Sequence, residues 1–370
     1  MIIGVPREIK PEENRIAIVP GGIEMLVQRG HTVLVESGAA KGSGFSDDEL
    51  QKAGARILST HSDIFAEADL VLKVKEPLPE EYHLLRAGQI LFTFLHLAAS
   101  EELTRTLLQK KIVGIAYETV QTEDGFLPLL APMSEIAGRM APQEGAKYLE
   151  KPCGGEGILL GGVAGVPPAH VVILGGGTVG YNAARVASGM GATVTILDVN
   201  PRKLRLMDEL FQGRIITIMA DSYNIRTIIK DADLLIGAVL LPGAKAPKLI
   251  ARDLLKTMRQ GTVLVDVSID QGGCAETSRP TTHAHPVYEE EGIIHYTVAN
   301  IPAAVPRTAT RALTLNTLPY AMEIAEKGWK KAVRENASLA KGVNMVEGSI
   351  TYRAVAEAFH LPHTPLDQIL

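Results

Sequence analysis

Cysteine is nearly absent from this chain of 370 residues, which contains only Cys153 and Cys274. The two form no CxxC pair and no disulfide framework, so we do not expect a disulfide-stapled extracellular domain. His283 and His285 lie downstream of Cys274, but no further ligand follows at a suitable spacing. We therefore expect no metal site.

Neither sign of charge dominates, and long apolar runs are also missing. Lysine and arginine number 37 against 42 acidic residues, a formal net charge of −5, and no basic block is present. Such a charge distribution does not favour nucleic acid or an anionic membrane as a partner. Residues 157–180 carry no Asp, Glu, Lys or Arg but are rich in glycine, so we predict loops around a buried strand and no membrane-spanning helix. The first residues lack a signal peptide's basic flank and apolar core, and we expect a cytoplasmic protein.

What the sequence does contain is typical of a soluble globular protein, with 46% hydrophobic and 21% charged residues. The length suggests two or three domains. In the first third, short apolar runs alternate with amphipathic stretches, which is typical of βαβ units and a parallel sheet. We predict strands at Ile2–Val5, Thr32–Glu36, Leu70–Val74, Ile90–Leu95 and Ile112–Ala116, and helices at Gly22–Arg29, Asp47–Ala53, Glu80–Arg86 and Glu101–Lys110.

The middle of the chain repeats this pattern more strongly. Between its strands lie helical patterns at Thr178–Met190 and Arg202–Phe211. Six strands with crossover helices indicate a complete doubly wound dinucleotide fold. The predicted strands are His170–Leu174, Thr193–Leu197, Ile215–Met219, Leu234–Val239, Val263–Val267 and Ile293–Val298.

The tail differs from both. A helical pattern runs from Arg307 to about Lys330, a shorter helix follows at Tyr352–Phe359, and no further strand is expected. We predict an α/β protein of two Rossmann-like doubly wound domains, the first discontinuous and completed by the C-terminal helical segment. The expected bounds are 1–130 with 307–370 for the first domain and 131–306 for the second. Hinges are expected in the helices near Ser134–Leu149 and after Arg307.

The most specific local motif is the glycine loop Gly175–Gly180, which follows a predicted strand and opens a predicted helix. Gly175 permits the tight turn, and Gly177 allows the backbone to approach a pyrophosphate. Gly180 lets the helix pack closely on the strand. The helix N-terminus then presents N–H groups to the phosphates. A purely structural glycine turn is the alternative, and the match of strand, loop and helix disfavours it.

Polar residues also follow other strands of this domain. Asp198 ends the next strand, where a carboxylate accepts hydrogen bonds from ribose hydroxyls and repels a 2′-phosphate, so NAD is favoured over NADP. The nearby Arg202 and Lys203 weaken that preference, and an ordinary surface aspartate is the alternative. Asp270 and Asn300 follow the fifth and sixth strands, either near the nicotinamide end of a dinucleotide or as local turn residues.

Ionisable side chains gather after the apolar runs of the first domain. Arg15 offers a guanidinium for a carboxylate, although a solvated loop arginine is the simpler interpretation. Lys73 and Lys75 lie two residues apart at the end of an apolar strand. They either border a ligand crevice or protect a sheet edge. His96 follows the next strand and suits proton transfer, or else it is a satisfied core histidine.

Together these motifs resemble alanine dehydrogenase, within the alanine dehydrogenase/NAD(P) transhydrogenase alpha-subunit family. The resemblance covers essentially the whole chain, in order and without large gaps. It is carried by Gly4-Val5-Pro6-Arg7-Glu8 with Glu13-Asn14-Arg15, Lys73-Val74-Lys75-Glu76-Pro77, Phe94-Leu95-His96, Met133-Ser134-Glu135-Ile136-Ala137-Gly138, Gly175–Gly180 and Asn300-Ile301-Pro302.

The resemblance implies the NAD-dependent, reversible oxidative deamination of L-alanine to pyruvate and ammonium. It implies substrate binding by Arg15, Lys75 and Asn300, and acid–base chemistry by His96 with Asp270. It further implies a discontinuous substrate domain, closure of the two domains during turnover, and a homo-oligomer, commonly a hexamer. The residues implied to bind NAD are Ser134, Gly175, Gly177, Thr178, Val179, Gly180, Asp198, Lys203, Ile269, Asp270, Val298 and Asn300.

Three other functions are compatible with this architecture. The NAD-binding component of a proton-translocating transhydrogenase does no substrate chemistry and has no need of Arg15, Lys75 and His96, so their presence favours the enzyme. Saccharopine-type dehydrogenases act on a much larger substrate, and the uninterrupted motifs favour alanine. A noncatalytic NAD-sensing protein is the third alternative, which kinetic measurements distinguish.

Overall fold

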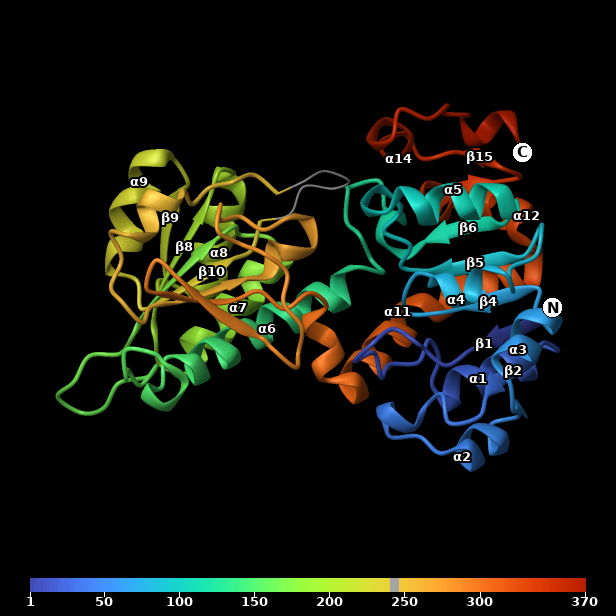
Figure 1. The fold of residues 1–370 in the computed structure, drawn as a ribbon, viewed down its shortest axis with the longest axis horizontal. Helices are drawn as coiled ribbons and strands as arrows, with labels where there is room; N and C mark the ends of the chain where they lie inside the picture. The colour runs from blue at the N-terminus through green and yellow to red at the C-terminus, as the bar shows by residue number, and fades with distance from the viewer. Residues whose placement is uncertain (240–245) are drawn as a thin grey trace. The chain divides into compact units, whose positions relative to one another are not determined.

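The computed structural model describes residues 1–239 and 246–370 of the chain. These residues form two compact units, one made of Met1–Met133 with Ala303–Leu370 and the other of Ser134–Pro302 (Figure 1). Each unit contains one predominantly parallel sheet, which confirms the predicted α/β class. The division of substrate and cofactor between the units remains a prediction. Within the described residues, no helix has the length and apolar character needed to cross a membrane.

The first unit is built on a sheet of eight strands in the order β15-β14-β6-β5-β4-β1-β2-β3. Strands β1 to β6 are parallel, and the direction of winding reverses between β1 and β4. In such sheets, ligands bind outside the carboxyl ends of the strands at this switch point. The strands are β1 (Ile2–Val5), β2 (Thr32–Glu36), β3 (Arg56–Leu58), β4 (Leu70–Leu72), β5 (Ile90–Thr93) and β6 (Val113–Ala116).

The helices of the first unit follow from local signals. Ser100 caps α5, its hydroxyl accepting a hydrogen bond from the Leu103 N–H, and Leu103 and Leu107 are buried one turn apart. The predicted helix Glu80–Arg86 is wrong in extent, because α4 ends at Tyr82. The helices of this part are α1 (Pro20–Gln28), α2 (Asp47–Lys52), α3 (His61–Glu67), α4 (Pro79–Tyr82) and α5 (Glu101–Lys110).

The tail adds strands as well as helices, so the prediction of a purely helical tail is wrong. Strand β14 (Val343–Val346) pairs antiparallel with β6, and β15 (Ser349–Ile350) pairs with β14. β14 was missed because Asn344 interrupts its apolar run, and β15 was missed because two residues show no pattern. The long helix α11 (Pro306–Lys327) ends at Gly328, whose positive φ of 73° leaves the helical region. It is followed by α12 (Trp329–Glu335), α13 (Ala337–Gly342) and α14 (Arg353–Ala358).

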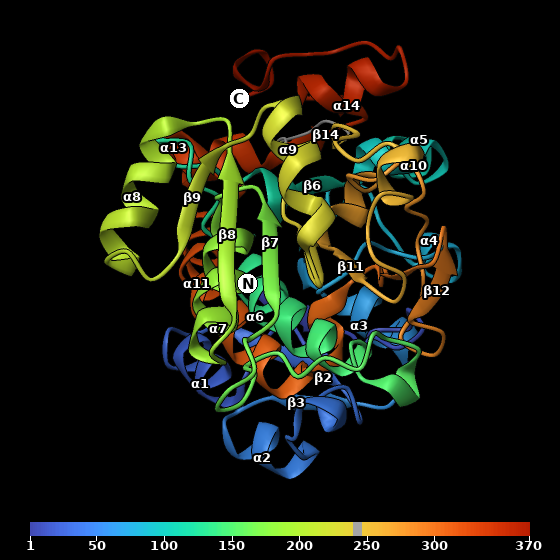
Figure 2. The same ribbon diagram turned by 90° about the vertical axis from the view of Figure 1, so that its left-hand side faces the viewer.

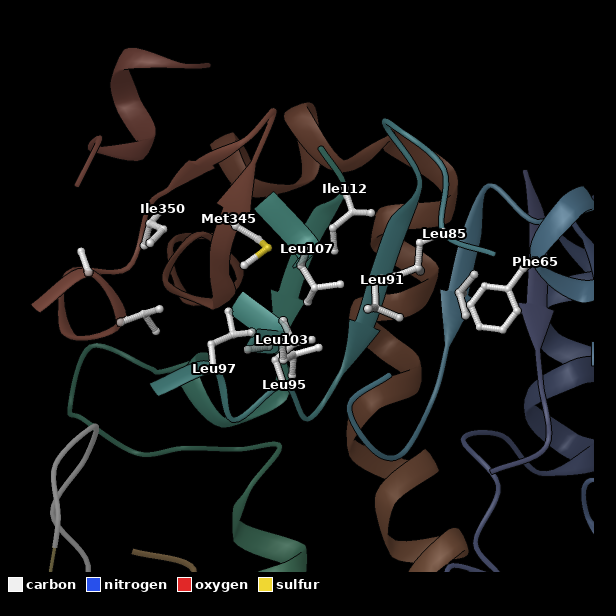
Figure 3. Packing of buried hydrophobic residues seen from close by; sticks show 14 of the residues in the cluster. Phe65, Leu85, Leu91, Leu95, Leu97, Leu103, Leu107, Ile112, Met345 and Ile350 are labelled. Carbon is white, nitrogen blue, oxygen red and sulfur yellow. The ribbon is translucent and has the colours of Figure 1, made fainter. Parts of the chain in front are cut away.

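One buried cluster joins the tail to the first part of the chain (Figure 3). Met345 and Ile350 of the tail pack in the same cluster as Leu95, Leu103 and Leu107, and all five are at most 2% exposed. A buried leucine contributes about 1.5–3 kcal/mol of hydrophobic free energy. The tail therefore helps to hold the end of β5 in place, immediately before His96.

The second unit contains a sheet of seven strands in the order β12-β13-β11-β10-β7-β8-β9. Figure 2 shows β9, β8 and β7 side by side. All its strands are parallel except the edge strand β12, giving the doubly wound dinucleotide order with its switch point between β7 and β10. The strands are β7 (His170–Leu174), β8 (Thr193–Asp198), β9 (Ile216–Met219), β10 (Leu234–Gly237), β11 (Val263–Asp266), β12 (Val287–Glu290) and β13 (Ile293–Tyr296). The helices are α6 (Ala131–Tyr148), α7 (Thr178–Gly189), α8 (Pro201–Phe211), α9 (Ser222–Ile228) and α10 (Arg252–Leu255).

Candidate active site

Arg15, in the segment after β1, is a buried arginine that a glutamate orients. Only 2% of the residue is exposed, so the interpretation as a solvated loop arginine is wrong. Its Nε lies 2.7 Å from Glu13 Oε1, and its Nη2 lies 2.5 Å from Glu13 Oε2. Its Nη1 contacts the Met133 sulfur at 3.0 Å. The two-point pairing fixes the plane of the guanidinium, and this role of Glu13 was not predicted.

Lys73 and Lys75 follow β4, which lies between β5 and β1, so the interpretation as sheet-edge lysines is wrong. Lys73 is fully buried, and its Nζ lies 2.7 Å from Glu81 Oε1 and 3.1 Å from Glu8 Oε2. With two carboxylates so close, the Lys73 ammonium forms ion pairs within the protein core. Lys75 is 8% exposed and remains the candidate for substrate.

The carboxylates around Lys73 belong to a longer buried chain of ion pairs. His61, at the start of α3, lies between Glu81 Oε1 at 3.0 Å from Nε2 and Glu36 Oε2 at 2.7 Å from Nδ1. Its ring also contacts Phe65 at 5.2 Å between centroids. Burial opposes the charged imidazolium, but hydrogen bonds to both carboxylates outweigh it and raise the pKa of His61 to about 9.

This pKa predicts a pH-dependent stability. The folded protein keeps the His61 proton in a range where the unfolded chain, at its ordinary pKa of 6.5, has released it. The resulting stabilisation, about 3 kcal/mol, is fully present below pH 6.5 and is lost as the pH rises to about 9. Urea unfolding across this range is expected to show a smaller decline for His61→Gln than for the unmodified protein. The control His83→Gln, at an exposed site, keeps the full decline, and equal declines in all three would contradict the assignment.

His96, after β5, has a constrained backbone and an accessible ring. Its φ of 48° is left-handed, its side chain is 38% exposed, and the ring stacks on Phe94 at 5.8 Å between centroids. The interpretation as a core histidine is therefore wrong. Glu118 accepts the His96 backbone N–H at 2.6 Å, and its Oε1 lies 3.9 Å from the ring Nδ1. Unusual backbone of this kind is concentrated at functional sites.

Glu76 pairs with Lys10, their Nζ and Oε1 lying 2.5 Å apart, and it lies within electrostatic range of Lys75 and His96. Burial raises the pKa of the Glu76 carboxyl, but Lys10, Lys75 and His96 outweigh it and hold the pKa below its ordinary value. The loops after β1, β4 and β5 thus bring Arg15, Lys75 and His96 to the carboxyl edge of adjacent strands in the first unit.

In the second unit, the glycine loop has the geometry that a dinucleotide needs. Gly175 has a φ of 107°, which disfavours any other residue. A Cβ on Gly180 would lie 1.8 Å from the Gly175 carbonyl oxygen, so helix α7 packs on the loop without room for a side chain. Gly177 is the N-cap of α7, and because it has no side chain, the first N–H groups, those of Thr178 and Val179, are left to a ligand.

Asp198 at the end of β8 is bound to this loop. Its Oδ2 accepts the Gly176 N–H at 2.7 Å, its Oδ1 accepts the Asn200 N–H at 2.7 Å, and only 6% of the residue is exposed. Lys203 Nζ lies 3.7 Å from Oδ2. The interpretation as an ordinary surface aspartate is therefore wrong. Each oxygen retains a lone pair, so the carboxylate fits the ribose hydroxyls of NAD.

Helix α6 supports the same loop. A Cβ on Gly138 would lie 2.4 Å from the Val179 carbonyl oxygen, which places α6 directly against the first turn of α7. The Arg139 Nε donates to Asn182 Oδ1 at 3.0 Å and fixes this contact. Ser134 lies one turn before Gly138 on α6.

Asp270 and Ile269 lie in a short 3-10 helix, Val267–Gln271, directly after β11. The fully buried Asp266 organises this segment, accepting hydrogen bonds from Ser268 N–H at 3.1 Å, Cys274 N–H at 2.8 Å and the Ser278 hydroxyl at 2.6 Å. Asp266 was not predicted, although it precedes Asp270 by one helical turn. Its role is to shape the loop that carries Asp270.

Val298 and Asn300 follow β13. Val298 bridges to Thr281, and Asn300 has a left-handed φ of 68°. His283 Nε2 lies 3.2 Å from the Asn300 carbonyl oxygen. Among residues 1–239 and 246–370, no three His, Cys, Asp or Glu residues come together as metal ligands would.

The comparisons with known proteins identify the family of the chain. Residues 4–137 match the family "Alanine dehydrogenase/PNT, N-terminal domain", and residues 141–353 match "Alanine dehydrogenase/PNT, C-terminal domain". The chain is 58% identical to an alanine dehydrogenase from Methanococcus maripaludis and 54% identical to one from Staphylococcus saprophyticus, in both cases over the full length of both proteins.

Solved structures give the same result. A structure of L-alanine dehydrogenase matches with a TM-score of 0.93 and 49% identity, covering 97% of this chain and 99% of the other. A transhydrogenase structure from Sinorhizobium meliloti matches with a TM-score of 0.79 and 23% identity, covering 96% and 100%, a likeness of fold alone. The present chain therefore belongs to the alanine dehydrogenase/PNT family.

Proposed function

We propose that this protein catalyses the NAD-dependent, reversible oxidative deamination of L-alanine to pyruvate and ammonium. The observation that carries the proposal is the set of Arg15, Lys75 and His96 at one sheet edge, in a chain 58% identical to an alanine dehydrogenase over its whole length. A transhydrogenase component needs only the nucleotide site. A homo-oligomer, hexameric by family resemblance, and a cytoplasmic location are part of the same proposal.

The substrate carboxylate is assigned to Arg15, whose guanidinium is held in position by Glu13. Lys75 supplies a positive charge that stabilises the carboxylate or the oxygen that develops on the substrate. Asn300 contributes an amide beside the substrate. These groups align the substrate Cα for reaction, and alignment accounts for much of the catalytic effect.

NAD is assigned to the second unit. The N–H groups of Thr178 and Val179 face the pyrophosphate, Asp198 holds the ribose, and Ser134, Lys203, Ile269 and Val298 complete the site. When bound, NAD⁺ supplies the acceptor for the hydride that leaves the alanine Cα.

Proton movement is assigned to His96 and Asp270. Once the alanine ammonium has given up one proton, loss of hydride from Cα leaves an iminium. Water adds to the iminium to form a carbinolamine, which then releases ammonium. His96 accepts the proton from this water and returns it to the leaving amine, while Asp270 exchanges protons with water. The side chain of His96 is 38% exposed.

Initial rates of NAD reduction with a panel of L-amino acids at mildly alkaline pH test the proposal. L-Alanine is expected to be the best substrate, and lysine-type substrates are expected to react little. Absence of reduction with every amino acid, alongside tight NADH binding, would contradict the enzyme assignment and favour the transhydrogenase-like module.

Replacing Asp198 is expected to change the choice of cofactor. Asp198→Ala removes the acceptor for the ribose hydroxyls and the charge that opposes a 2′-phosphate, so the KM for NAD rises about tenfold or more while the KM for NADP falls. The control is Asp208→Ala, at an exposed site on α8. An unchanged ratio of kcat/KM for the two cofactors would refute the role of Asp198.

A further inference from the structure

We propose that Glu8 is a positioning residue for Lys75, acting from the end of a buried ionic network that the reaction itself does not use. The network runs from Glu8 through Lys73 and Glu81 to His61 and Glu36. The proposal rests on the proposed function, because it assigns a cause to the placement of a substrate-binding lysine.

The Glu8 carboxylate accepts backbone N–H groups that a neighbouring strand would otherwise bind. Strand β1 ends at Val5 and β4 ends at Leu72, so the backbone beyond Leu72 no longer pairs with β1, although it still bonds to the β5 side. Glu8 Oε1 accepts the Val74 N–H at 2.6 Å and the Lys75 N–H at 3.3 Å. Buried backbone N–H groups require such partners, so a carboxylate at this point fixes the path of the chain through Lys75.

The other side of Lys75 is fixed from β5. The Thr93 hydroxyl donates to the Lys75 carbonyl oxygen at 3.0 Å, and the Phe94 N–H donates to the Val74 carbonyl oxygen at 3.4 Å. Thr93 is fully buried and Glu8 is 7% exposed. The backbone of Lys75 is therefore held between two buried side chains, one from the segment after β1 and one from β5.

Lys73 and Glu81 hold the Glu8 carboxylate in place. Lys73 Nζ bridges Glu8 Oε2 and Glu81 Oε1, and burial of the ammonium is outweighed by these carboxylates, which raise the pKa of Lys73. The second oxygen of Glu81 accepts the Leu78 N–H at 2.8 Å. Both oxygens of Glu8 thus have fixed partners. A side chain can position another residue only if it is itself held in place.

Kinetics of Glu8→Asp and Glu8→Gln with alanine, pyruvate and NAD test the proposal. The shorter carboxylate of Glu8→Asp no longer spans the distance from Lys73 to the backbone, and Glu8→Gln places an amide against the Lys73 ammonium. Both are expected to lower kcat/KM for alanine about 10- to 100-fold and to raise the KM for alanine and pyruvate at least threefold. The KM for NAD is expected to stay within about twofold, since the nucleotide-binding residues are untouched.

Two further variants separate positioning from general loss of structure. Asp233→Asn alters another buried carboxylate, which is 5% exposed and lies at the amino end of β10 in the second unit. Asp233 accepts the His170 backbone N–H at 2.7 Å and pairs with Arg259. It is expected to lower stability and leave every KM unchanged.

Thr93→Val removes the hydrogen bond from the Thr93 hydroxyl to the Lys75 carbonyl oxygen without removing a charge. It is expected to raise the KM for alanine about three- to tenfold.

The outcomes are distinguishable. An unmodified protein that fails to oxidise alanine overturns the proposed function itself. An active unmodified protein whose folded Glu8 variants keep the KM for alanine and pyruvate within twofold overturns the positioning role. If neither Glu8 variant folds, Thr93→Val decides, since an unchanged KM for alanine would then refute the clamp on Lys75.

Discussion

His96→Ala is expected to lower kcat for alanine oxidation about 10²- to 10⁴-fold while NADH binding stays nearly intact. The imidazole follows β5 in the first unit, its side chain is 38% exposed, and its Nδ1 lies 3.9 Å from Glu118 Oε1. Without it, the proposed mechanism loses the group that accepts the proton of the attacking water. Steady-state kinetics together with a fluorescence titration of NADH measure the two effects separately.

The backbone of His96 requires a second variant. A φ of 48° is costly for alanine, whereas asparagine tolerates the left-handed region. His96→Asn therefore keeps the backbone and removes only the titrating ring, and it is expected to lose as much activity as His96→Ala. His83→Ala, at an exposed site in the same unit, serves as the control. Near-normal turnover by His96→Asn would overturn the acid–base role.

Gly180→Ala is expected to have the largest effect on the nucleotide site. The new methyl group would lie 1.8 Å from the Gly175 carbonyl oxygen, a backbone atom, so either the loop or helix α7 has to move. We expect a loss of about 3 kcal/mol in the free energy of unfolding and an increase of about 100-fold in the Kd for NADH.

Gly189 provides a matched control at the other end of the same helix. Nothing lies within 4 Å of a Cβ at Gly189, so Gly189→Ala adds a methyl group in open space. Its stability is expected to rise slightly, because alanine loses less backbone entropy than glycine on folding. Denaturant unfolding and NADH titration of both variants are the measurements. Similar behaviour of the two variants would refute the packing argument for the glycine loop.

The sequence predicted the parts of the fold that are periodic and local. Strands such as Ile2–Val5 and His170–Leu174 were predicted with their observed bounds, because fully buried parallel strands are uninterrupted apolar runs. The strands it missed are β3, β12, β14 and β15, which have two to four residues each. Such short strands form because a neighbouring strand is already in place, and local sequence contains little sign of that.

The residues of the site divide in the same way. Gly175–Gly180 and Asp198 could be singled out because they have a fixed spacing, and in the structure the Gly176 N–H donates to Asp198. The partners of Lys73, which are Glu8 and Glu81, come from other elements and follow from no spacing rule. The sequence pattern made Lys73 and Lys75 equal candidates, and only the tertiary contacts show that Lys73 is fully buried in ion pairs, which leaves Lys75 as the lysine proposed to bind substrate.

The most direct test of the central claim is transfer of label from L-alanine deuterated at C2. If the protein oxidises alanine by hydride transfer from Cα, the deuterium is expected in the NADH formed, with one NADH and one pyruvate produced per alanine consumed. A primary isotope effect on single-turnover reduction would accompany it. Formation of NADH without deuterium, or tight NADH binding with no reduction at all, would contradict the account.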